Sequence, residues 1–578
     1  MKSLFFSRLN VIRYFIIGGF LLIFFQAARI QIFGDSRLKA MRAKQYNKHF
    51  LLQPKRGPIL DRNGEILAFN IQSKSLAANP KKILKKEILA DRLSQAISIS
   101  KEKILEKFQT SRSFIWIKRH LNEDELERLK EEGILNAQGS RIDGLWTSEE
   151  SKRIYPHQSL ASHVVGDVDI DSQGIEGMEL WMNEKLKGKT AKFSIIQDAL
   201  GRAAFFDSTQ IQEASDGESV ILSLDIILQF KVENALKQAI ENTGSKSGTV
   251  LIMNSKNGEI LVLANFPSFE PSQKREQFQW RRNRALTDGF EPGSIVKPLL
   301  LATALSHGWK LEDQIWGEEG SFLIQGHSIT EANKKQYEWL SLEKMIQFSS
   351  NICASKLALQ LEGPVYIDFL KKLGFGKKTG VNFPGEISGY LPNANTISPL
   401  TLANLGFGQG MLVNVLQMVR AYACIQNGGW LIQPTFIRDH ILKNTSPIPV
   451  FSSEISDQLI STLEKVTQSG GTGTRAALAN FRVAGKTGTG QKIDPETRRY
   501  ATDKDVHTFI GFLIGMDPQY IILTQLDEPQ NFRFASSTTA PLFQKVLQAL
   551  IHQYYFTSPP ILSKTEEENK LSHLKKRE

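Results

Sequence analysis

The stretch Phe290–Pro298 places a serine and a lysine three residues apart, directly after a Pro-Gly turn. An apolar helix is predicted from Ser294 to about His307, so the Ser294 and Lys297 side chains share one face, one turn apart. A serine hydroxyl is a weak nucleophile until a base takes its proton, and a lysine whose charge is disfavoured by its surroundings can be that base. A helix N-terminus also favours the negative charge that develops in acyl transfer. The pattern therefore predicts Ser294 as a nucleophile activated by Lys297.

The Ser-x-x-Lys spacing alone is a weak signal, because the chain contains it elsewhere on stretches typical of solvated helix faces. It recurs at Ser36, Ser98, Ser100, Ser341 and Ser572. Two further motifs single out Ser294 because they follow it in order along the chain. The first is Ser349-Ser350-Asn351, which in isolation is typical of an ordinary helix cap.

The third motif, Lys486–Thr489 (Lys-Thr-Gly-Thr), lies just upstream of two strands predicted near the C-terminus. Lys246 and Lys378 also begin Lys-Ser-Gly or Lys-Thr-Gly tripeptides, but only Lys486 is followed by a second Thr-Gly. On an exposed strand, a lysine and two threonine hydroxyls can hold a carboxylate by charge-assisted hydrogen bonds. The small glycines let a substrate backbone pair alongside the strand.

The ordered set Ser-x-x-Lys, Ser-x-Asn and Lys-Thr-Gly is the signature of penicillin-binding proteins and serine β-lactamases, and the chain resembles the class B transpeptidases of that superfamily. Motifs similar to those of the class B pedestal domain are Arg56–Ala68, Arg153, Tyr155-Pro156, His163 and Gly174–Glu179. Motifs similar to transpeptidase landmarks are Gly374–Gly376, Phe383–Glu386, Gly406–Gly410 and Asn427–Gly429. Two residues depart from the pattern, since Thr508 stands where Ser is expected and Gln409 where Tyr is expected. These departures put only local packing in doubt.

The resemblance implies a peptidoglycan D,D-transpeptidase whose donor substrate is a stem peptide ending in D-Ala-D-Ala. Ser294 would attack the carbonyl of the penultimate D-Ala, with Lys297 as the base. Ser349, helped by Lys486, would relay a proton to the departing D-Ala. An amine of a neighbouring stem would then take the acyl group, and β-lactams would leave Ser294 blocked.

The same resemblance assigns four substrate-binding residues. Asn351 should hold the substrate amide, while Thr487 and Thr489, on either side of Gly488, should bind the terminal carboxylate. The oxyanion would lie between the backbone N–H groups of Ser294 and Thr489, a type of contact worth roughly 3–4 kcal/mol. The chemistry requires no cofactor and no metal.

Composition restricts the function classes further. The chain has 578 residues, 41% of them hydrophobic, and a formal net charge of +11. Such an excess of positive charge suits nucleic acid, an anionic membrane or an acidic wall polymer, but no nucleic-acid-binding motif is present. The two cysteines, Cys353 and Cys424, lie in apolar helical stretches and are interpreted as buried thiols. The scattered histidines show no metal-ligand spacing.

The N-terminal segment is predicted to be a single transmembrane anchor. An uncharged apolar run, Tyr14–Ala28, extends to Val11–Phe33 if Arg13 and Arg29 reach toward the two interfaces. Basic residues before the span predict a cytoplasmic N-terminus and a catalytic region outside the bacterial inner membrane, in the periplasm. A cleaved signal peptide is the alternative, because small residues precede Arg29.

A mixed α/β (α+β) fold is predicted for the rest of the chain. The expected domains are the cytoplasmic end and anchor at 1–45, an α+β pedestal or dimerisation domain at 46–215, a transpeptidase domain at 216–555, and a charged, disordered tail at 556–578. A helix should follow Asp225 and stop at Gly244, and a hairpin should span 249–264. Strands are also predicted at 507–515 and 519–527. Strands at both ends with helices between predict an antiparallel sheet covered by helices, as in β-lactamases.

Several alternatives remain beside the septal, penicillin-binding protein 3 type of transpeptidase, which Arg282–Pro298 and Val168–Glu179 resemble. An elongation-type class B enzyme would differ in partners, and the expected partners of a septal enzyme are divisome membrane proteins, including a glycosyltransferase. A D,D-carboxypeptidase or β-lactamase would pass the acyl group to water. A bifunctional synthase would need another domain where the Arg56 motif lies. A non-catalytic β-lactam sensor or scaffold would keep the pocket without turnover.

Overall fold

The computed structural model falls into two compact units. One is Met1–Arg56 with Lys187–Glu218, and the other is Gly57–Leu186 with Ser219–Glu578. The described residues are 2–33, 47–52, 54–136, 139–189, 191–197, 203–206, 215–271, 273, 278–332, 334–438, 446–494, 497, 499–530 and 532–554. The predicted disordered tail, 556–578, lies outside the described residues.

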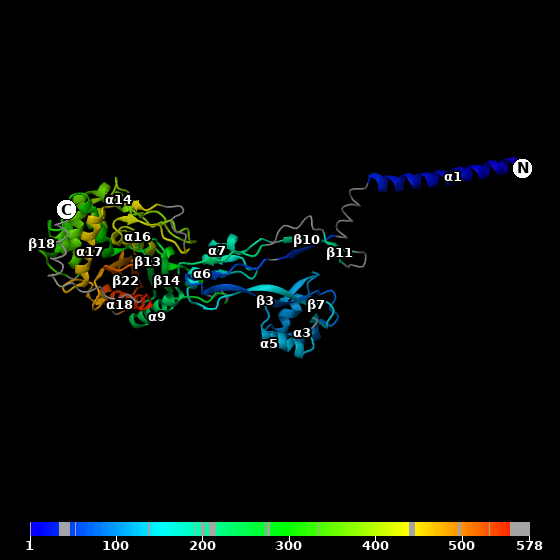
Figure 1. Cartoon of the computed structure of the whole chain (residues 1–578), viewed down its shortest axis with the longest axis horizontal. Coiled ribbons are helices and arrows are strands. Elements are labelled where there is room, and N and C mark those ends of the chain that lie inside the picture. Colours follow the sequence, from blue (N-terminus) through cyan, green and yellow to red (C-terminus); the bar gives the residue numbers. More distant parts are fainter. Residues whose placement is uncertain are drawn as a thin grey trace, which may run out of the picture. The chain divides into compact units, whose positions relative to one another are not determined.

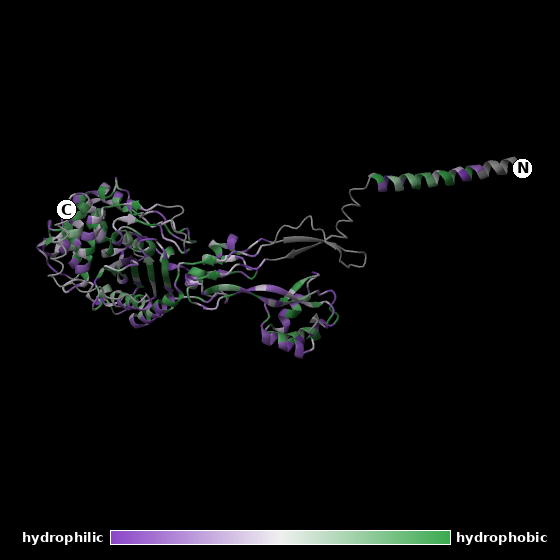
Figure 2. Ribbon diagram, in the orientation of Figure 1, coloured by the Kyte–Doolittle hydropathy of each residue, from purple (hydrophilic) through white to green (hydrophobic). Residues whose placement is uncertain are grey.

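The first unit contains the predicted apolar span. Helix α1 (Lys2–Ala28) continues into a π-helical turn, η1 (Arg29–Phe33). Its segment Asn10–Ile32 is apolar and long enough to cross a membrane, and none of it is buried inside the protein. Figure 2 shows hydrophobic residues along most of α1. Strands β1 (Asn47–Leu52), β10 (Ala191–Gln197) and β11 (Ala203–Phe206) form a separate antiparallel sheet.

The second unit begins with a sheet on which three helices pack. The long strand β3 pairs with β2, β4 and β7, and β12 pairs with β2. The strands are β2 (Ile59–Leu60), β3 (Ile66–Ala78), β4 (Ile115–Lys118), β7 (Leu145–Ile154) and β12 (Val220–Ile221). The helices are α3 (Lys86–Ala96), α4 (Lys101–Phe108) and α5 (Glu123–Glu131). Short elements complete this region: β5 (Leu135–Asn136), β6 (Gly139–Ser140), α6 (Ser162–Val165), β8 (Asp167–Val168), β9 (Gly174–Glu176), α7 (Gly177–Trp181) and α8 (Asn183–Leu186).

A five-stranded antiparallel sheet with the order β14-β13-β23-β22-β21 forms the centre of the remaining part. Its strands are β13 (Ser247–Asn254), β14 (Ile260–Phe266), β21 (Val483–Ile493), β22 (Tyr500–Leu513) and β23 (Tyr520–Asp527). The predicted hairpin and the two late strands are confirmed, although β22 begins seven residues before 507, because it pairs with the long strand β21 as far as Tyr500. Strand β21, which carries Lys486, is an edge strand.

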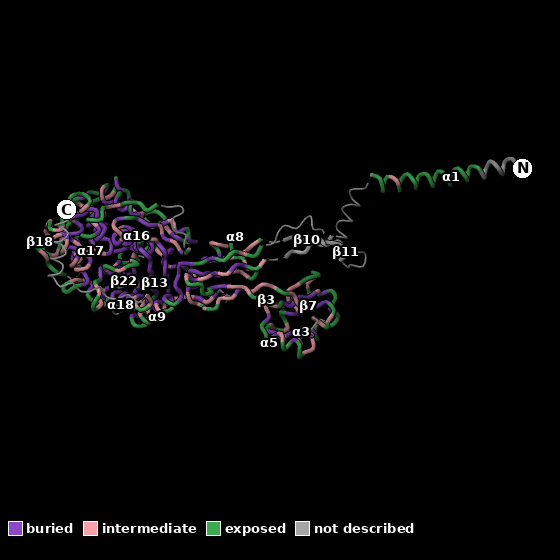
Figure 3. Tube along the Cα trace, viewed as in Figure 1, coloured by how far each residue is buried: buried purple, intermediate pink, exposed green. Residues whose placement is uncertain are grey.

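Helices cover both faces of this sheet, as predicted, and Figure 1 shows the sheet between them. Successive residues of β13 face opposite sides, so Val250 and Ile252 pack against α9 and α18, whereas Leu251 and Met253 face the other helices. β13 and β22 are buried along most of their length (Figure 3). The first face is covered by α9 (Ile226–Thr243) and α18 (Thr539–Tyr554). The second is covered by α11 (Lys297–Ser306), α12 (Leu342–Phe348), α13 (Asn351–Leu361), α14 (Gly363–Lys372), α15 (Pro399–Gly406), α16 (Val415–Gln426) and α17 (Ser453–Thr467).

Smaller elements connect these helices and strands. They are η3 (Phe278–Trp280), α10 (Arg284–Thr287), η4 (Gly293–Val296), β15 (Gln314–Trp316), η5 (Glu318–Gly320), β16 (Ser321–Ile324), β17 (His327–Thr330), β18 (Trp339–Ser341), β19 (Trp430–Leu431), β20 (Ile448–Pro449), η6 (Thr474–Ala476) and η7 (Ala535–Ser537).

Local sequence signals explain the ends of α9. The Asp225 side chain accepts a hydrogen bond from Leu228 N, which caps the helix start. Gly244 adopts a left-handed conformation with a φ of 62°, which ends the helix where the sequence predicts. Cys353 and Cys424 are buried, free thiols on α13 and α16, and this prediction is also confirmed.

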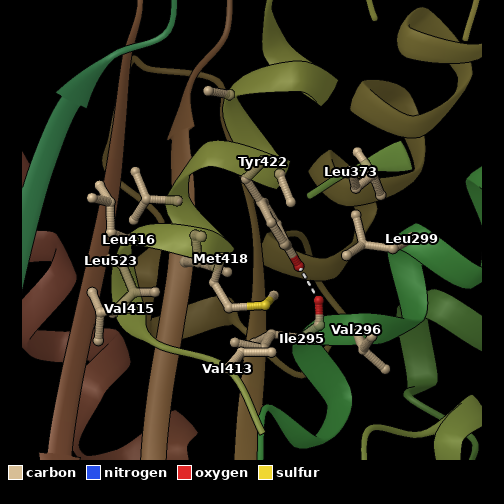
Figure 4. Close-up of a cluster of buried hydrophobic side chains, with 14 of the residues drawn as sticks. Ile295, Val296, Leu299, Leu373, Val413, Val415, Leu416, Met418, Tyr422 and Leu523 are labelled. Carbon is tan, nitrogen blue, oxygen red and sulfur yellow. Dashed lines mark hydrogen bonds between the residues drawn. The ribbon is translucent and has the colours of Figure 1, made fainter. Parts of the chain in front are cut away.

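Helix α16 is buried on nearly all sides and contacts the turn that carries Ser294. The Tyr422 hydroxyl, fully buried on α16, donates a hydrogen bond of 2.8 Å to Ile295 O (Figure 4). Burial raises the pKa of Tyr422 well above its ordinary value, so the hydroxyl stays a donor. One buried hydrogen bond therefore ties the turn after Ser294 to the core.

Tyr422→Phe should reduce the free energy of unfolding by about 1–2 kcal/mol, because Ile295 O then loses its partner inside the core. Urea unfolding followed by circular dichroism measures this loss. Tyr366→Phe is the matched control, since the Tyr366 hydroxyl is fully buried and has no hydrogen-bond partner among the described residues. The control should be neutral or stabilising, and equal losses in both variants would contradict the role given to the Tyr422 hydrogen bond.

Candidate active site

Ser294 lies in the 3₁₀ turn η4, which leads directly into α11. The predicted helix is confirmed to Ser306, but its first turn is 3₁₀ and not α-helical. The reason is Pro298, which has no N–H to donate to Ser294 O, so Lys297 N donates to that carbonyl from one residue closer. The tighter turn leaves the Ser294 side chain half-buried.

Glycines let three backbone segments meet around Ser294. A Cβ on Gly293 would lie 2.7 Å from Thr489 O, and one on Gly488 would lie 2.9 Å from Pro292 O. On the other side of the turn, a Cβ on Gly408 would lie 2.2 Å from Gly293 O, and Gly293 N donates to Gly408 O at 3.1 Å. The turn is thus held between strand β21 and the Gly406–Gly410 loop.

The Ser349-Ser350-Asn351 motif forms the junction between α12 and α13. Ser349 ends α12 in a left-handed conformation with a φ of 62°, and Ser350 caps α13 by accepting from Cys353 N. A non-glycine residue in this region is held there by its surroundings. Here Lys297 Nζ donates to Ser349 O at 2.6 Å, which is one such restraint.

Two fully buried lysines meet at the Ser349 hydroxyl. Lys486 Nζ donates to Ser349 Oγ at 2.9 Å, and Lys297 Nζ lies 3.3 Å from the same oxygen. Lys297 Nζ also donates to Asn351 Oδ1 at 2.8 Å, so its three hydrogen bonds all go to Ser349 and Asn351. The Ser294 hydroxyl makes no hydrogen bond within the described part of the chain.

Burial sets the protonation behaviour of both lysines. It lowers the pKa of Lys297 to about 7, although the carboxylate of Glu331 acts in the opposite direction. Burial, and then the nearby charge of Lys297, lower the pKa of Lys486 well below its ordinary value. A lysine with a pKa near 7 can take a proton at neutral pH, as a general base must.

The Lys-Thr-Gly-Thr motif lies on β21, at the edge of the sheet beside η4. Thr489 is half-buried, whereas Thr487 is buried and its hydroxyl donates to Thr472 Oγ1 at 3.1 Å. Thr472 belongs to a glycine-rich stretch after α17 that the sequence reasoning did not single out. The glycines on both sides of Thr472 were the sequence feature that could have identified it.

Glu331 is a second site residue that the sequence reasoning missed. Its carboxylate accepts from Ser350 Oγ at 2.5 Å and from Asn351 N at 2.8 Å. Nothing in the sequence signals this contact, because Glu331 lies 18 residues before the motif in an irregular loop after β17.

Within the described residues, the competing motifs and the two departures make no hydrogen bond to Lys297 or Lys486. Lys378 is exposed in a loop, and Lys246 forms an ion pair with Glu528. Gln409 donates to Gln491 Oε1 at 3.0 Å, across from the loop to β21. Thr508 is buried on β22, opposite Gly488.

The arrangement can therefore support acyl transfer to a serine. It combines a half-buried hydroxyl at the start of a helix, a lysine that can be neutral, and a hydroxyl bridging two amines for proton transfer. Next to it lies β21, which pairs only with β22 among the described strands, and an extended substrate can pair with such an edge strand.

The comparison with known families matches both parts of the chain. Residues 248–548 match the penicillin-binding protein transpeptidase domain, and residues 51–222 match the penicillin-binding protein dimerisation domain. A probable peptidoglycan D,D-transpeptidase PenA from Neisseria meningitidis is 33% identical over 499 residues, covering 85% of this chain and 83% of its own. The peptidoglycan D,D-transpeptidase FtsI of Escherichia coli is 30% identical over 512 residues, which cover 86% of this chain and 83% of FtsI.

Solved structures agree with these matches. Penicillin-binding protein 3 of Mycobacterium tuberculosis, complexed with aztreonam, is 25% identical with a TM-score of 0.67, covering 88% of this chain and 98% of its own. A peptidoglycan synthetase of Bifidobacterium adolescentis shares the fold with a TM-score of 0.70 at 21% identity, covering 90% and 99%. As the motifs predicted, the chain belongs to the penicillin-binding protein transpeptidase family, in the class B group that pairs this domain with a dimerisation domain.

Proposed function

We propose that this protein is a peptidoglycan D,D-transpeptidase that cross-links stem peptides through an acyl-enzyme on Ser294. One observation carries the proposal: two buried lysines share the Ser349 hydroxyl beside a serine at a helix start. The relatives named as peptidoglycan D,D-transpeptidases and the neighbour complexed with a β-lactam support the same substrate class.

In the acylation step, Ser294 Oγ bonds to the carbonyl carbon of the penultimate D-Ala while its proton passes to neutral Lys297. The C–N bond to the terminal D-Ala then breaks. The departing amine receives a proton through Ser349 Oγ, which Lys486 or Lys297 resupplies. The hydrogen bonds of both lysines to Ser349 Oγ support this route.

In the second step, the amine of a neighbouring stem attacks the ester carbonyl. It forms the cross-linking amide and loses a proton to Lys297, and Ser294 Oγ leaves and regains its proton. Asn351 holds the donor amide, and its side chain is already oriented by Lys297 and by Thr330 O at 3.1 Å.

The oxyanion is bound by the backbone N–H groups of Ser294 and Thr489. In a β-strand, the N–H and C=O groups of one residue point to the same side of the strand. Thr489 O lies against Gly293 and so points away from β22. The N–H of Thr489 therefore points away from β22 as well. Thr487, Gly488 and Thr489 form the edge that receives the terminal carboxylate, with Thr472 orienting the Thr487 hydroxyl.

The chain is proposed to be anchored in the inner membrane by Asn10–Ile32, with its N-terminus in the cytoplasm and its catalytic region in the periplasm. The proposed division is an anchor at 1–45, a pedestal at 46–215 and a transpeptidase domain at 216–555. Sequencing the N-terminus of the membrane-bound protein tests the anchor, since a new start near Ala28 would instead indicate a cleaved signal peptide.

A fluorescent penicillin should label Ser294, and Ser294→Ala should abolish both labelling and cross-linking, because Ser294 supplies the only hydroxyl of the described turn η4 that opens α11. Mass spectrometry of the labelled peptide identifies the site. With a D-Ala-D-Ala donor and an amine acceptor, an amide product is expected. Hydrolysis alone would favour a carboxypeptidase or β-lactamase, and labelling without turnover would favour a sensor. An adduct on Ser341 would refute the assignment.

Lys486→Ala should slow acylation by roughly 10²- to 10⁴-fold, because Ser349 Oγ loses a proton donor in the site. Lys378→Ala is the matched control, since it removes the same charge from an exposed Lys-Thr-Gly tripeptide. Stopped-flow measurement of penicillin acylation compares the two. Equal losses in two folded variants would mean that the wrong Lys-Thr-Gly was chosen.

The role is proposed to be septal, with membrane proteins of the divisome, including a glycosyltransferase, as partners. The similarity to FtsI of Escherichia coli supports this choice over an elongation-type enzyme. Depletion in a rod-shaped host should therefore block division and give long filaments, as seen by phase-contrast microscopy. Round cells that continue to divide would instead indicate the elongation role, with the transpeptidase chemistry unaffected.

A further inference from the structure

A buried carboxylate lies behind the Ser349-Ser350-Asn351 turn. Glu331, in the loop after β17, is 5% exposed and faces the N-terminus of α13. It accepts hydrogen bonds from Ser350 Oγ at 2.5 Å, Asn351 N at 2.8 Å and Ile352 N at 3.4 Å. The first N–H groups of a helix lack partners within the helix and favour negative charge, and the Glu331 carboxylate accepts hydrogen bonds from two of them.

The same loop also orients the Asn351 side chain. Asn351 Nδ2 donates to Thr330 O at 3.1 Å, which turns Oδ1 toward Lys297 Nζ at 2.8 Å. Residues 330 and 331 therefore hold both the backbone and the side chain of Asn351. They act on Lys297 through the turn without touching the substrate edge of β21.

The titratable groups around Lys297 come from β21, from α13 and from the segment between β17 and β18. Lys486 on β21 is the second buried amine, and Glu331 supplies the negative charge that acts on Lys297. Burial raises the pKa of the Cys353 thiol on α13 and raises that of Tyr337 to about 12, so both stay neutral near pH 7. One carboxylate thus acts on Lys297, which shares the Ser349 hydroxyl with Lys486. A buried site with one carboxylate approaches neutrality when the two amines share a single ionising proton.

We propose that Glu331 is a positioning residue of the transpeptidase site, which holds the Ser349–Asn351 turn and supplies the charge that keeps one proton on the Lys297–Lys486 pair. This inference rests on the proposed function, because it assigns Lys297 the work of a base. Glu331 acts through the lysines and the turn and makes no contact with substrate.

If Glu331 acts through its charge, removing that charge should shift the pH dependence of acylation in one direction. A purely structural role predicts no such shift. Acylation needs neutral Lys297, so its rate rises with pH through the pKa of Lys297, near 7. Glu331 raises that pKa. Removing its charge should therefore lower the pKa and move the rising limb of the rate profile to lower pH. Loss of a helix cap alone would reduce the rate at every pH and leave the limb in place.

The test is the second-order rate of acylation by a fluorescent penicillin, measured on the full chain in detergent between about pH 5 and pH 9. Glu331→Gln should move the limb down by about one pH unit or more. Glu331→Asp, which keeps the charge, should return the limb to the wild-type position with a lower plateau.

Glu386→Gln is the matched control, because Glu386 is a buried carboxylate that binds Thr379 N at 2.7 Å and Thr379 Oγ1 at 2.6 Å, away from the lysine pair. It should lower the Tm and leave the limb unmoved.

A lower plateau with an unmoved limb in Glu331→Gln would overturn the proposal, and so would an equal shift in Glu386→Gln. If Glu331→Gln does not melt cooperatively, Glu331→Asp and Ser350→Ala decide the matter, since both keep the charge. In both variants the rising limb of the acylation rate should stay at the wild-type pH. A shift of the limb in either variant overturns the proposal. A wild-type protein that forms no adduct on Ser294 would refute the proposed function itself, whereas an adduct with an unmoved limb refutes this inference alone.

Discussion

The site depends on the burial of two lysine amines against one serine hydroxyl. Moving an ammonium group out of water costs free energy unless each of its N–H donors finds an acceptor. Lys297 meets this condition with Ser349 O, Ser349 Oγ and Asn351 Oδ1. The left-handed backbone of Ser349 is part of the same arrangement, because Lys297 binds its carbonyl as well as its hydroxyl. The residual cost of burial is what brings the pKa of Lys297 near neutrality. Stability and chemistry at this point therefore have a common physical origin.

That arrangement requires three elements from distant parts of the chain to meet within hydrogen-bond distance. Lys297 comes from α11, Ser349 from the α12–α13 junction, and Lys486 from the edge strand β21. Glycine at Gly293, Gly408 and Gly488 removes the side chains that would hold the backbones apart. The Tyr422 hydroxyl then secures the turn that carries Ser294 against the buried helix α16. The sheet and its two helical layers serve chiefly to hold these parts in place.

The geometry also brings the groups that can carry protons next to the edge of the sheet. Lys297 and Glu331 come from α11 and from the loop after β17, whereas Lys486 comes from the edge strand β21 itself. Thr487 and Thr489 follow Lys486 on the same strand. Because β21 pairs only with β22 among the described strands, it is an edge strand, and unpaired edge groups can pair with another extended chain.

Local sequence determined much of this picture, because short-range rules govern it. The Asp225 cap and Gly244 stop defined α9, the apolar pattern over 249–264 predicted the β13–β14 hairpin, and motif order singled out Ser294, Ser349 and Lys486. The tertiary structure alone decided what depends on contacts between distant segments. It made the first turn of α11 a 3₁₀ turn, directed all three Lys297 hydrogen bonds to the Ser349–Asn351 turn, and brought in Glu331 and Thr472, which carry no motif. Spacing along a chain predicts which side chains share a helix face, but burial and through-space charge, which set the protonation of Lys297, exist only once the chain has folded.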